Sequence, residues 1–280
     1  QLDVPKIILS RFDFRKLFYY QVIVAGRVEA ENMHIQAYNN KRYPPSTKVP
    51  LTPMQLLFSF KSYLNIDTLH LKNFNANYDE LQMNGDEPGK ATFNNLSVII
   101  TNLTNDPVRI KKNPLCIMEI SGLLFAKAAI DIKMIFFLND RKGKFTLNAS
   151  VNDFDPKIFN SMITPVSNGK IVSGNVRKAI VAMNGNNNNI TGTLELYYNN
   201  LQLDFADPNS SKLKSKAMSI AANIAIVNDN PTEKYPFRYG AIAYTRSSNQ
   251  AIFNYIWKAI FESIKSVVMQ KGENKKRNNK

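Results

Sequence analysis

The sequence is poor in the residues that usually build reactive or metal-binding sites. Its 280 residues include one cysteine, Cys116, and two histidines, His34 and His70. A single cysteine can form neither an internal disulfide nor a cluster of thiolate ligands, and neither histidine has a metal-like spacing to another ligand. Cys116 lies among apolar residues in NPLCIMEI, which predicts a small buried side chain and not a nucleophile.

Sequence patterns of known catalytic sites are also missing. The chain has no glycine-rich phosphate loop, no G-x-S-x-G nucleophile elbow and no signature of paired catalytic carboxylates. Each histidine lies in an alternating segment opposite apolar neighbours, which is typical of a strand residue that faces solvent. We therefore expect a protein that is not an enzyme and that uses no metal ion or other cofactor.

Long hydrophobic runs are absent as well. No stretch approaches the roughly 18 consecutive apolar residues of a membrane-spanning helix. The chain begins with Gln1 and not with methionine, and KIILSRFDF lacks the apolar centre of a signal peptide. We therefore expect the sequence to be a trimmed form or a fragment of a longer protein.

Acidic residues are in the minority. Asp and Glu number 22 against 36 Lys and Arg, which gives a formal net charge of +14. Apart from KGENKKRNNK at residues 271–280, predicted to be a disordered tail, the cations are scattered. This predicts a solvated basic surface, with an anion-binding face as the alternative. No strand interleaves aromatic and basic residues as a stacking platform does, so no nucleic-acid partner is expected.

The sequence does contain many alternating apolar and polar residues, with a slip in the alternation. In GTLELYYNNLQLDF the apolar residues take even positions before Asn199-Asn200 and odd positions after it: Leu194, Leu196 and Tyr198, then Leu201, Leu203 and Phe205. The same arrangement, a glycine and two alternating runs that meet at or beside asparagine, recurs in GRVEAENMHIQAY and GKATFNNLSVII. These segments indicate a degenerate internal repeat.

The slip has two structural interpretations. It is either a two-residue turn between the strands of a hairpin, or a bulge in one long, bent strand. In the first repeat the turn residues would be Glu31-Asn32, and glutamate is poorly suited to the positive φ of a type I′ turn. We therefore favour long, kinked strands, and a hairpin stays open for Asn199-Asn200 and Asn94-Asn95 because asparagine tolerates this conformation.

Two further segments alternate over a complete apolar face and are joined by the turn NDRKGK, where Gly143 can adopt a positive φ. Matched alternation on either side of a turn predicts neighbouring strands with one continuous apolar surface. We expect this surface, together with the repeat that follows Gly192, to line a groove. The predicted lining residues are Ile132, Met134, Phe136, Phe145, Leu147, Ala149, Val151, Leu194, Leu196, Leu201 and Leu203.

Helices are predicted at intervals between the strands. Thr52 with Pro53 begins one in TPMQLLFSFKSYL, and Asp155 with Pro156 begins another in DPKIFNSMI, because a capping side chain followed by proline is typical of a helix start. PNSSKLKSKAMSIAANIAI is predicted to be helical from about Ser211. These helices can cover or fill the groove.

The clearest helix is FNYIWKAIFESIKSVVMQ, predicted from Asn254 to about Met269. Its apolar stripe holds Ile256, Trp257, Ile260, Phe261, Ile264, Val267 and Val268, and its polar face holds Lys258, Glu262, Ser263, Lys265 and Ser266. The stripe can pack on the sheet or lie on a membrane. Two cations with a glutamate between them are weak for a membrane-surface helix. We therefore expect Trp257, Ile260, Phe261 and Ile264 to pack on the sheet.

Together these patterns predict a mainly β fold with a few helices (α+β). Long, curved, repeated antiparallel strands form a partly open β-groove, and the C-terminal amphipathic helix caps it. Residues 1–270 are expected to form one β-rich domain, since single all-β units reach this length.

Five segments between about Pro53 and Val268 combine alternation with Gly, Asn and Pro punctuation: PMQLLFSFKSYLNIDTLHLKNFNANYDE, GKATFNNLSVIITNLTND, DFDPKIFNSMITPVSNGKIVSGNV, GTLELYYNNLQL and FNYIWKAIFESIKSVV. Their span from first to last takes in most of the chain. In order and spacing they resemble the C-terminal region of the AsmA-like family of bacterial envelope proteins, as it appears in Bacteroidetes-type members.

The resemblance implies a non-enzymatic protein that is tethered to the inner membrane by an N-terminal anchor, which this chain does not contain, and whose β-rich body lies in the periplasm. Its apolar groove would shield or transfer a phospholipid or another envelope lipid between inner and outer membrane and so support outer-membrane biogenesis. The family offers no catalytic residues to carry over. The alternative is a periplasmic scaffold or protein-interaction module that binds no lipid.

Overall fold

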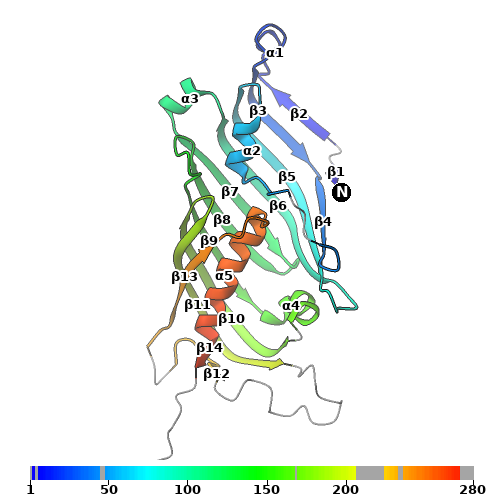
Figure 1. Ribbon diagram of the computed structural model, residues 1–280, viewed down its shortest axis with the longest axis vertical. Helices are drawn as coiled ribbons and strands as arrows, with labels where there is room; N and C mark the ends of the chain where they lie inside the picture. The colour runs from blue at the N-terminus through cyan, green and yellow to red at the C-terminus, as the bar shows by residue number, and fades with distance from the viewer. Residues whose placement is uncertain are drawn as a thin grey trace, which may run out of the picture.

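One large open sheet dominates the computed structural model of the chain, which describes residues 2–3, 6–44, 48–167, 169–205, 224–232 and 236–271. The sheet has 12 strands, most of them antiparallel, and few helices accompany it (Figure 1). The predicted fold class, mainly β with long antiparallel strands and a few helices, is confirmed. The tail residues 272–280 and residues 206–223, where a helix was predicted, lie outside the described residues.

The strands of the large sheet include four that are 16 to 18 residues long, namely β5, β6, β10 and β11. The 12 strands are β1 (Leu2–Asp3), β2 (Lys6–Ser10), β3 (Ile23–Glu31), β4 (His34–Asn40), β5 (Leu64–Leu81), β6 (Gly89–Thr104), β7 (Leu115–Leu124), β8 (Ala128–Phe137), β9 (Phe145–Phe154), β10 (Gly169–Gly185), β11 (Asn189–Phe205) and β13 (Tyr239–Thr245). A second, small sheet pairs β12 (Ile224–Ile226) with β14 (Met269–Lys271). The helix predicted from about Ser211 was wrong at its end, because Ile224–Ile226 form a strand.

Strand order follows the sequence over most of the sheet. From β5 to β11 each strand pairs with the next along the chain, and β13 completes that side. On the other side, β3 and β4 both pair with β5, and this pairing is parallel. Parallel neighbours need a crossover connection, and the segment between β4 and β5, which contains a short helix, supplies it. The predicted antiparallel pairing therefore holds for most of the sheet, and this edge adds two parallel pairs that the sequence did not indicate.

The slips in alternation are bends within long strands and not hairpin turns. β11 runs through Asn200, which has a φ of 53°, and β6 runs through Asn95, with a φ of 52°. Asn32, between β3 and β4, and Asn73 in β5 also have positive φ, and their side-chain amides are hydrogen-bonded at 2.6 Å. The preference for kinked strands is thus confirmed, and the bends of neighbouring strands lie side by side, as bulges that curve a sheet do.

The described helices are short except for the last one. They are α1 (Phe14–Tyr20), α2 (Pro53–Ser59), α3 (Pro107–Lys112), the 3₁₀ turn η1 (Pro156–Phe159), α4 (Asn160–Ser167) and α5 (Ile252–Val268). The predicted caps hold: Thr52 and Gln55 form a capping box on α2, and Asp155 caps η1. Sequence reasoning missed α1 and α3, although Asp13 and Asp106 cap them in the same way.

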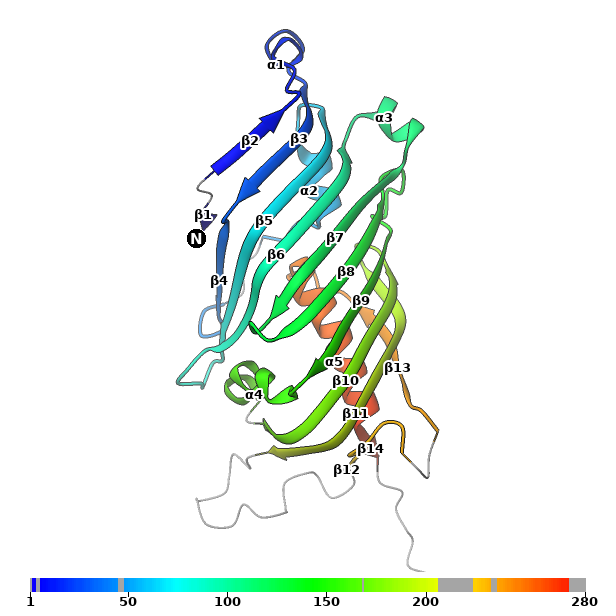
Figure 2. The same ribbon diagram turned by 180° about the vertical axis from the view of Figure 1, so that it is seen from behind.

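The two faces of the sheet differ in what covers them. α2 and α5 lie against one face, which we call the inner face, whereas none of the described helices covers the opposite face (Figures 1 and 2). α5 packs on β13 and β11, and its Phe253 also contacts Tyr78 of β5 and Phe93 of β6. Five strands separate β6 from β13 in the sheet order, so the sheet curves around α5.

The crossover segment before α2 reaches the far side of the sheet. Thr52 Oγ1 donates to Asn187 Oδ1, in the turn between β10 and β11, at 2.8 Å. Arg246, which follows β13, donates from Nη2 to Pro50 O at 2.6 Å and from Nε to Gln250 O at 2.9 Å. Contacts from one arginine thus hold together the crossover segment and the start of α5.

Candidate functional site

The inner face of β8 and β9 carries the apolar residues predicted to line a groove. The two strands pair antiparallel, with Ile132 opposite Ala149, Met134 opposite Leu147 and Phe136 opposite Phe145, as the matched alternation predicted. Val151 extends the row, opposite Ile130. Gly143, in the turn between the strands, has a φ of 69°, the conformation expected for it. These side chains form one continuous apolar surface.

β11 continues this surface on both sides of its bend. Leu194 and Leu196 lie before Asn200 and Leu201 after it, and all three are buried in the same hydrophobic core. Leu203 packs against that core and is partly buried. The left-handed conformation of Asn200 therefore keeps the apolar side chains on one face, although they occupy even positions before it and odd positions after it.

Most of the predicted lining residues are covered from above. Met134, Phe136, Phe145 and Leu147 belong to one core cluster that also contains buried residues of α2 and α5, whereas Ile132, Ala149 and Val151 are partly buried at its margin. The part of the inner face under these helices is therefore a packed core, and a ligand there would have to displace α5.

α5 packs on the sheet as expected, and Val267 and Val268 of its predicted apolar stripe are buried, but its other fully buried residues are not the predicted ones. Its buried side chains are Tyr255, Ala259, Ser263, Val267 and Val268. The predicted contacts Trp257, Ile260, Phe261 and Ile264 are partly buried beside this line, and Trp257 stacks on Phe159 of η1 with ring centroids 6.2 Å apart. The placement of Ser263 on the polar face was wrong.

Close approach between α5 and β13 explains why small residues form the buried line. A Cβ atom on Gly240 of β13 would lie 2.3 Å from Ser263 Oγ and 3.0 Å from the Ser263 carbonyl oxygen. The hydrophobic pattern of the helix does not contain this information, because it reports polarity and not the space that a facing strand leaves. Glycine on one element and serine on the other let the two backbones meet.

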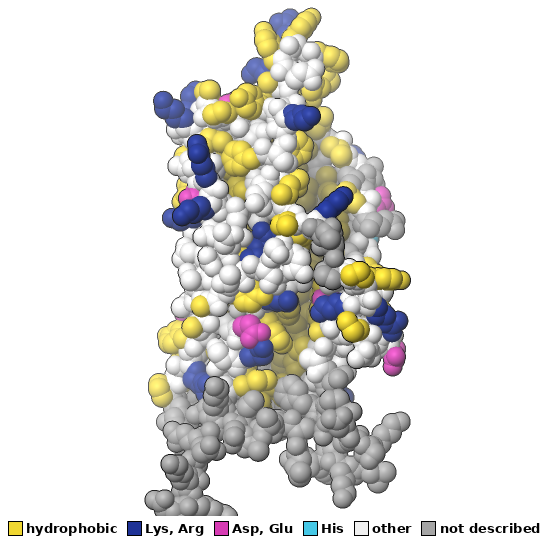
Figure 3. Space-filling model, in the orientation of Figure 1, with side chains coloured by type: hydrophobic (Ala, Val, Ile, Leu, Met, Phe, Trp, Pro, Cys, Tyr) yellow, Lys and Arg dark blue, Asp and Glu magenta, His cyan; other side chains and the backbone are white. Residues whose placement is uncertain are grey.

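The inner face remains open to one side of α5. Figure 3 shows the surface hollowed between this helix and the strands β4 and β5, with apolar side chains on the floor of the hollow. Phe253 of α5 is 39% exposed, and its ring centroid lies 5.7 Å from that of Tyr78 on β5 and 5.6 Å from that of Phe93 on β6. We call this feature the side hollow and define it by Tyr78, Phe93 and Phe253.

A polar network adjoins the side hollow. Tyr78 donates its hydroxyl to Glu80 Oε2 at 2.6 Å, and Lys41 forms an ion pair with the same carboxylate, which is buried. Burial raises the pKa of Glu80, but the hydrogen bonds from Lys41 and Tyr78 outweigh it and leave this pKa below its ordinary value. Burial, followed by the Glu80 contact, raises the pKa of Tyr78 well above its usual range. The network therefore holds one paired charge at the edge of an apolar surface.

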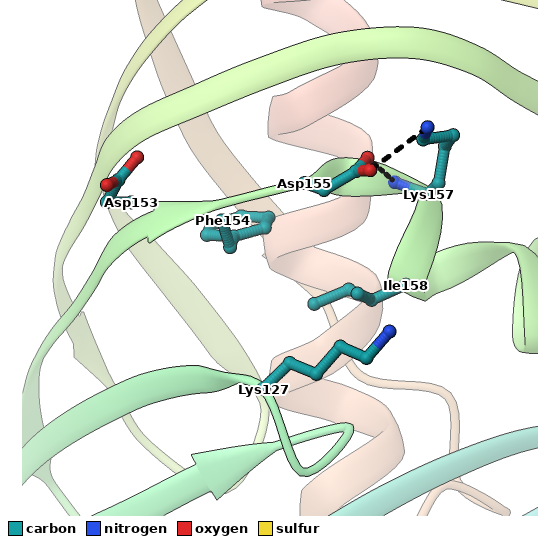
Figure 4. Close-up of a pocket in the computed structure, with 6 residues that line it drawn as sticks. All are labelled: Lys127, Asp153, Phe154, Asp155, Lys157 and Ile158. Atoms are coloured by element: carbon teal, nitrogen blue, oxygen red, sulfur yellow. Dashed lines mark hydrogen bonds and ion pairs between the residues drawn. The ribbon is translucent and has the colours of Figure 1, made fainter.

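A pocket of about 450 Å³ lies where the turn between β7 and β8 approaches η1 (Figure 4). Its lining mixes charges of both signs with two apolar side chains: Lys127, Asp153, Phe154, Asp155, Lys157 and Ile158. Asp155 is engaged as a cap, accepting from Lys157 N at 2.9 Å, and its carboxylate pairs with Lys157 Nζ at 3.1 Å. Asp155 and Lys157 are therefore used to begin η1, and their place in the pocket has a structural explanation.

Cys116 and His70 lie in structural settings. Burial raises the pKa of the Cys116 thiol to about 12, and the side chain is buried in the core, as predicted. The ring of His70 is 3.1 Å from Ser97 Oγ and 3.2 Å from Arg27 Nη2, within a charged cluster that includes Glu29. Within the described ranges, no three His, Cys, Asp or Glu side chains are grouped so as to hold a metal ion.

Comparison with known proteins adds no relative. No protein-family model, curated protein or solved structure matches the chain. Among the helices that the structure describes, none combines the length and the apolar character needed to cross a bilayer.

Proposed function

We propose that the protein is a non-enzymatic component of a bacterial envelope, similar to the AsmA-like family, whose apolar inner face shields or transfers a lipid between the inner and outer membranes. Such a role supports outer-membrane biogenesis. In this proposal the complete protein is tethered to the inner membrane by an N-terminal anchor outside this chain, and its β-rich body lies in the periplasm. The resemblance in segment order and spacing supports the family and its location.

The observation that carries the proposal is the partly covered apolar inner face. An acyl chain needs a surface that excludes water along its length but has no need of specific polar contacts. Long strands supply that length, and α5 does not cover the side hollow beside it in the part of the chain that the structure describes (Figure 3). We place the acyl chain in the side hollow, against Tyr78, Phe93 and Phe253, with the packed lining residues of β8, β9 and β11 beyond it.

The proposal is tested by the lipid that accompanies the purified chain. The protein is extracted with organic solvent and the extract is analysed by mass spectrometry for phospholipid. In Phe253→Glu a carboxylate enters the side hollow, where burying it beside an acyl chain is unfavourable. We expect lipid with the wild-type chain and at least about tenfold less with the variant.

The matched control is Val172→Glu on β10. Val172 is 46% exposed, similar to Phe253, but it lies between buried Ile171 and partly buried Ser173 and points away from them. We expect this variant to retain lipid, and both variants to unfold at the wild-type temperature. Absence of lipid from the wild-type chain, or unchanged lipid in Phe253→Glu, would contradict the proposal.

A scaffold that binds other proteins and no lipid is the second candidate, and edge strand β2 favours it. β2 pairs on one side with β3, and its Ile7 and Leu9 are exposed. An exposed edge with apolar side chains is a template for strand addition by a partner. A lipid-free chain that captures an extended peptide along β2, and loses it in Ile7→Pro, would establish this function.

A further inference from the structure

Helix α1 presents aromatic side chains to solvent. Phe14, Phe18, Tyr19 and Tyr20 are between 64% and 80% exposed, and none of the seven residues of α1 is buried. Large apolar side chains are usually scattered singly on a surface, and a group of them marks an interaction site. The sheet is complete without these rings, so core packing does not explain them.

The connections of α1 hold it at one end of the molecule. It lies in the loop between β2 and β3, where Asp13 N donates to Val24 O at 3.0 Å and the Asp13 side chain caps the helix. Arg11, at the base of this loop, pairs with Asp67 of β5, and Arg109 of α3 pairs with the same carboxylate. One aspartate therefore ties α1 and α3 together, and both views place them at the same end of the long axis (Figures 1 and 2).

Other exposed apolar residues and several cations share this end. Tyr63 is held beside the base of α1, since its carbonyl accepts from Ile23 N at 2.9 Å, and Tyr63, Phe60 and Val108 are exposed. The exposed cations on α1 and α3 include Arg15, Lys111 and Lys112, and within the described part of the chain no ion pair joins these three to an acid. We define the end surface as Phe14, Arg15, Phe18, Tyr19, Tyr20, Phe60, Tyr63, Val108, Lys111 and Lys112.

We propose that the end surface binds the headgroup region of an anionic lipid bilayer. Phenylalanine favours the acyl boundary, tyrosine favours the interface, and lysine and arginine are attracted to anionic headgroups. This combination surrounds a helix that projects from the end of the sheet, which suits contact with a flat, soft surface. The contact is peripheral, and it does not depend on lipid in the side hollow.

The shape of the end surface argues against a second copy of the chain as occupant. A stable dimer buries about 800 Å² on each partner, across 20 to 30 residues. The end surface offers a projecting helix of seven residues and a few flanking side chains. The surplus of cations would also repel an identical surface.

The test is co-sedimentation of the whole chain with vesicles. Two kinds of vesicle are used: phosphatidylcholine mixed with anionic phosphatidylglycerol, and phosphatidylcholine alone. Each is titrated with the wild-type protein, with Phe18→Ser/Tyr19→Ser and with Lys111→Glu/Lys112→Glu. We expect the wild-type chain to bind the anionic vesicles more tightly, and each double variant to lose at least about tenfold in affinity. Because these side chains are exposed, thermal unfolding should be unchanged.

Matched controls carry equal changes elsewhere. Tyr38→Ser/Met83→Ser removes two exposed apolar side chains from β4 and the turn after β5, and Arg177→Glu/Lys178→Glu reverses two exposed charges on β10. Both controls should bind like the wild-type chain. Failure of the wild-type protein to bind anionic vesicles, or equal losses in the controls, would overturn the proposal. Concentration-dependent dimerisation abolished by Phe18→Ser/Tyr19→Ser, without vesicle binding, would assign the end surface to self-association instead.

Discussion

Asn230 is a fully buried polar side chain in which each hydrogen-bonding atom has a partner. Its Nδ2 donates to Leu196 O at 2.8 Å and to Arg238 O at 3.0 Å, and its Oδ1 accepts from Arg238 N at 2.9 Å. Its backbone also pairs with Tyr198 in both directions. Through these bonds Asn230 holds the segment that follows β12 against Leu196 and Tyr198 of β11.

We expect Asn230→Ala to lower the free energy of unfolding by about 3 kcal/mol, because three backbone groups, one buried and two partly buried, lose their side-chain partner. Asn228→Ala is the matched control, since the exposed Asn228 donates one hydrogen bond, to Leu201 O at 2.7 Å. It should cost about 1 kcal/mol. Urea unfolding followed by circular dichroism measures both, and equal losses would show that burial of the amide is not decisive.

Some buried polar groups on α5 lack the partners that Asn230 has. The hydroxyls of Tyr255 and Ser263 are buried and make no hydrogen bond with any described residue. An unpaired buried hydroxyl costs free energy, so Ser263 is present for its size and not for its oxygen. At these positions close packing of α5 on the sheet is achieved although two buried hydroxyls are left without hydrogen bonds.

At the scale of elements, this fit can be tested on the contact between α5 and β13. Gly240→Ala should lower the free energy of unfolding by about 1 to 3 kcal/mol, because its methyl group would meet both Ser263 Oγ and the Ser263 carbonyl oxygen. Adding Ser263→Gly removes the hydroxyl contact but not the carbonyl contact and should restore part of the loss. If the loss in the double variant equalled the sum of the losses in the two single variants, the residues would not interact.

The bent strands are the second feature at this scale, and Asn200 is the position to test. Its φ of 53° is tolerated by asparagine and glycine but strained for alanine. Asn200→Ala should therefore cost about 1 kcal/mol in chemical unfolding, whereas Asn200→Gly should stay close to the wild-type value. If alanine and glycine behaved alike, the left-handed conformation would not limit the stability of β11.

These elements show what the sequence can and cannot predict. The bends were predictable because a slip in a period of two, next to asparagine, is visible in one segment alone. The lining residues of β8 and β9 were predictable for the same reason. The parallel pairing of β3 and β4 with β5, and the use of Ser263 against Gly240, depend on contacts between distant segments, which periodicity does not report. The exposed rings of α1 follow no packing pattern at all.

At the scale of the whole molecule, the inner face is partly covered by connections from opposite sides of the sheet. The crossover segment between β4 and β5 spans toward the turn after β10, and α5 returns from β13 toward β5 and β6. Both approaches meet at Arg246, which contacts Pro50, Asn187 and Gln250. The extent to which the inner face opens should therefore depend on this one side chain.

We expect Arg246→Met to lower the free energy of unfolding by about 2 kcal/mol, because charged hydrogen bonds to three carbonyl oxygens are lost. The loss should be local. In hydrogen exchange, residues 48–59 and 250–258 should exchange faster than in the wild-type chain, whereas β7, β8 and β9 should be unchanged, because their ladder does not involve Arg246. Arg177→Met, on the exposed side of β10, is the control and should change neither quantity. Uniformly faster exchange across the sheet would show that Arg246 stabilises the fold as a whole and does not act as a local latch on the inner face.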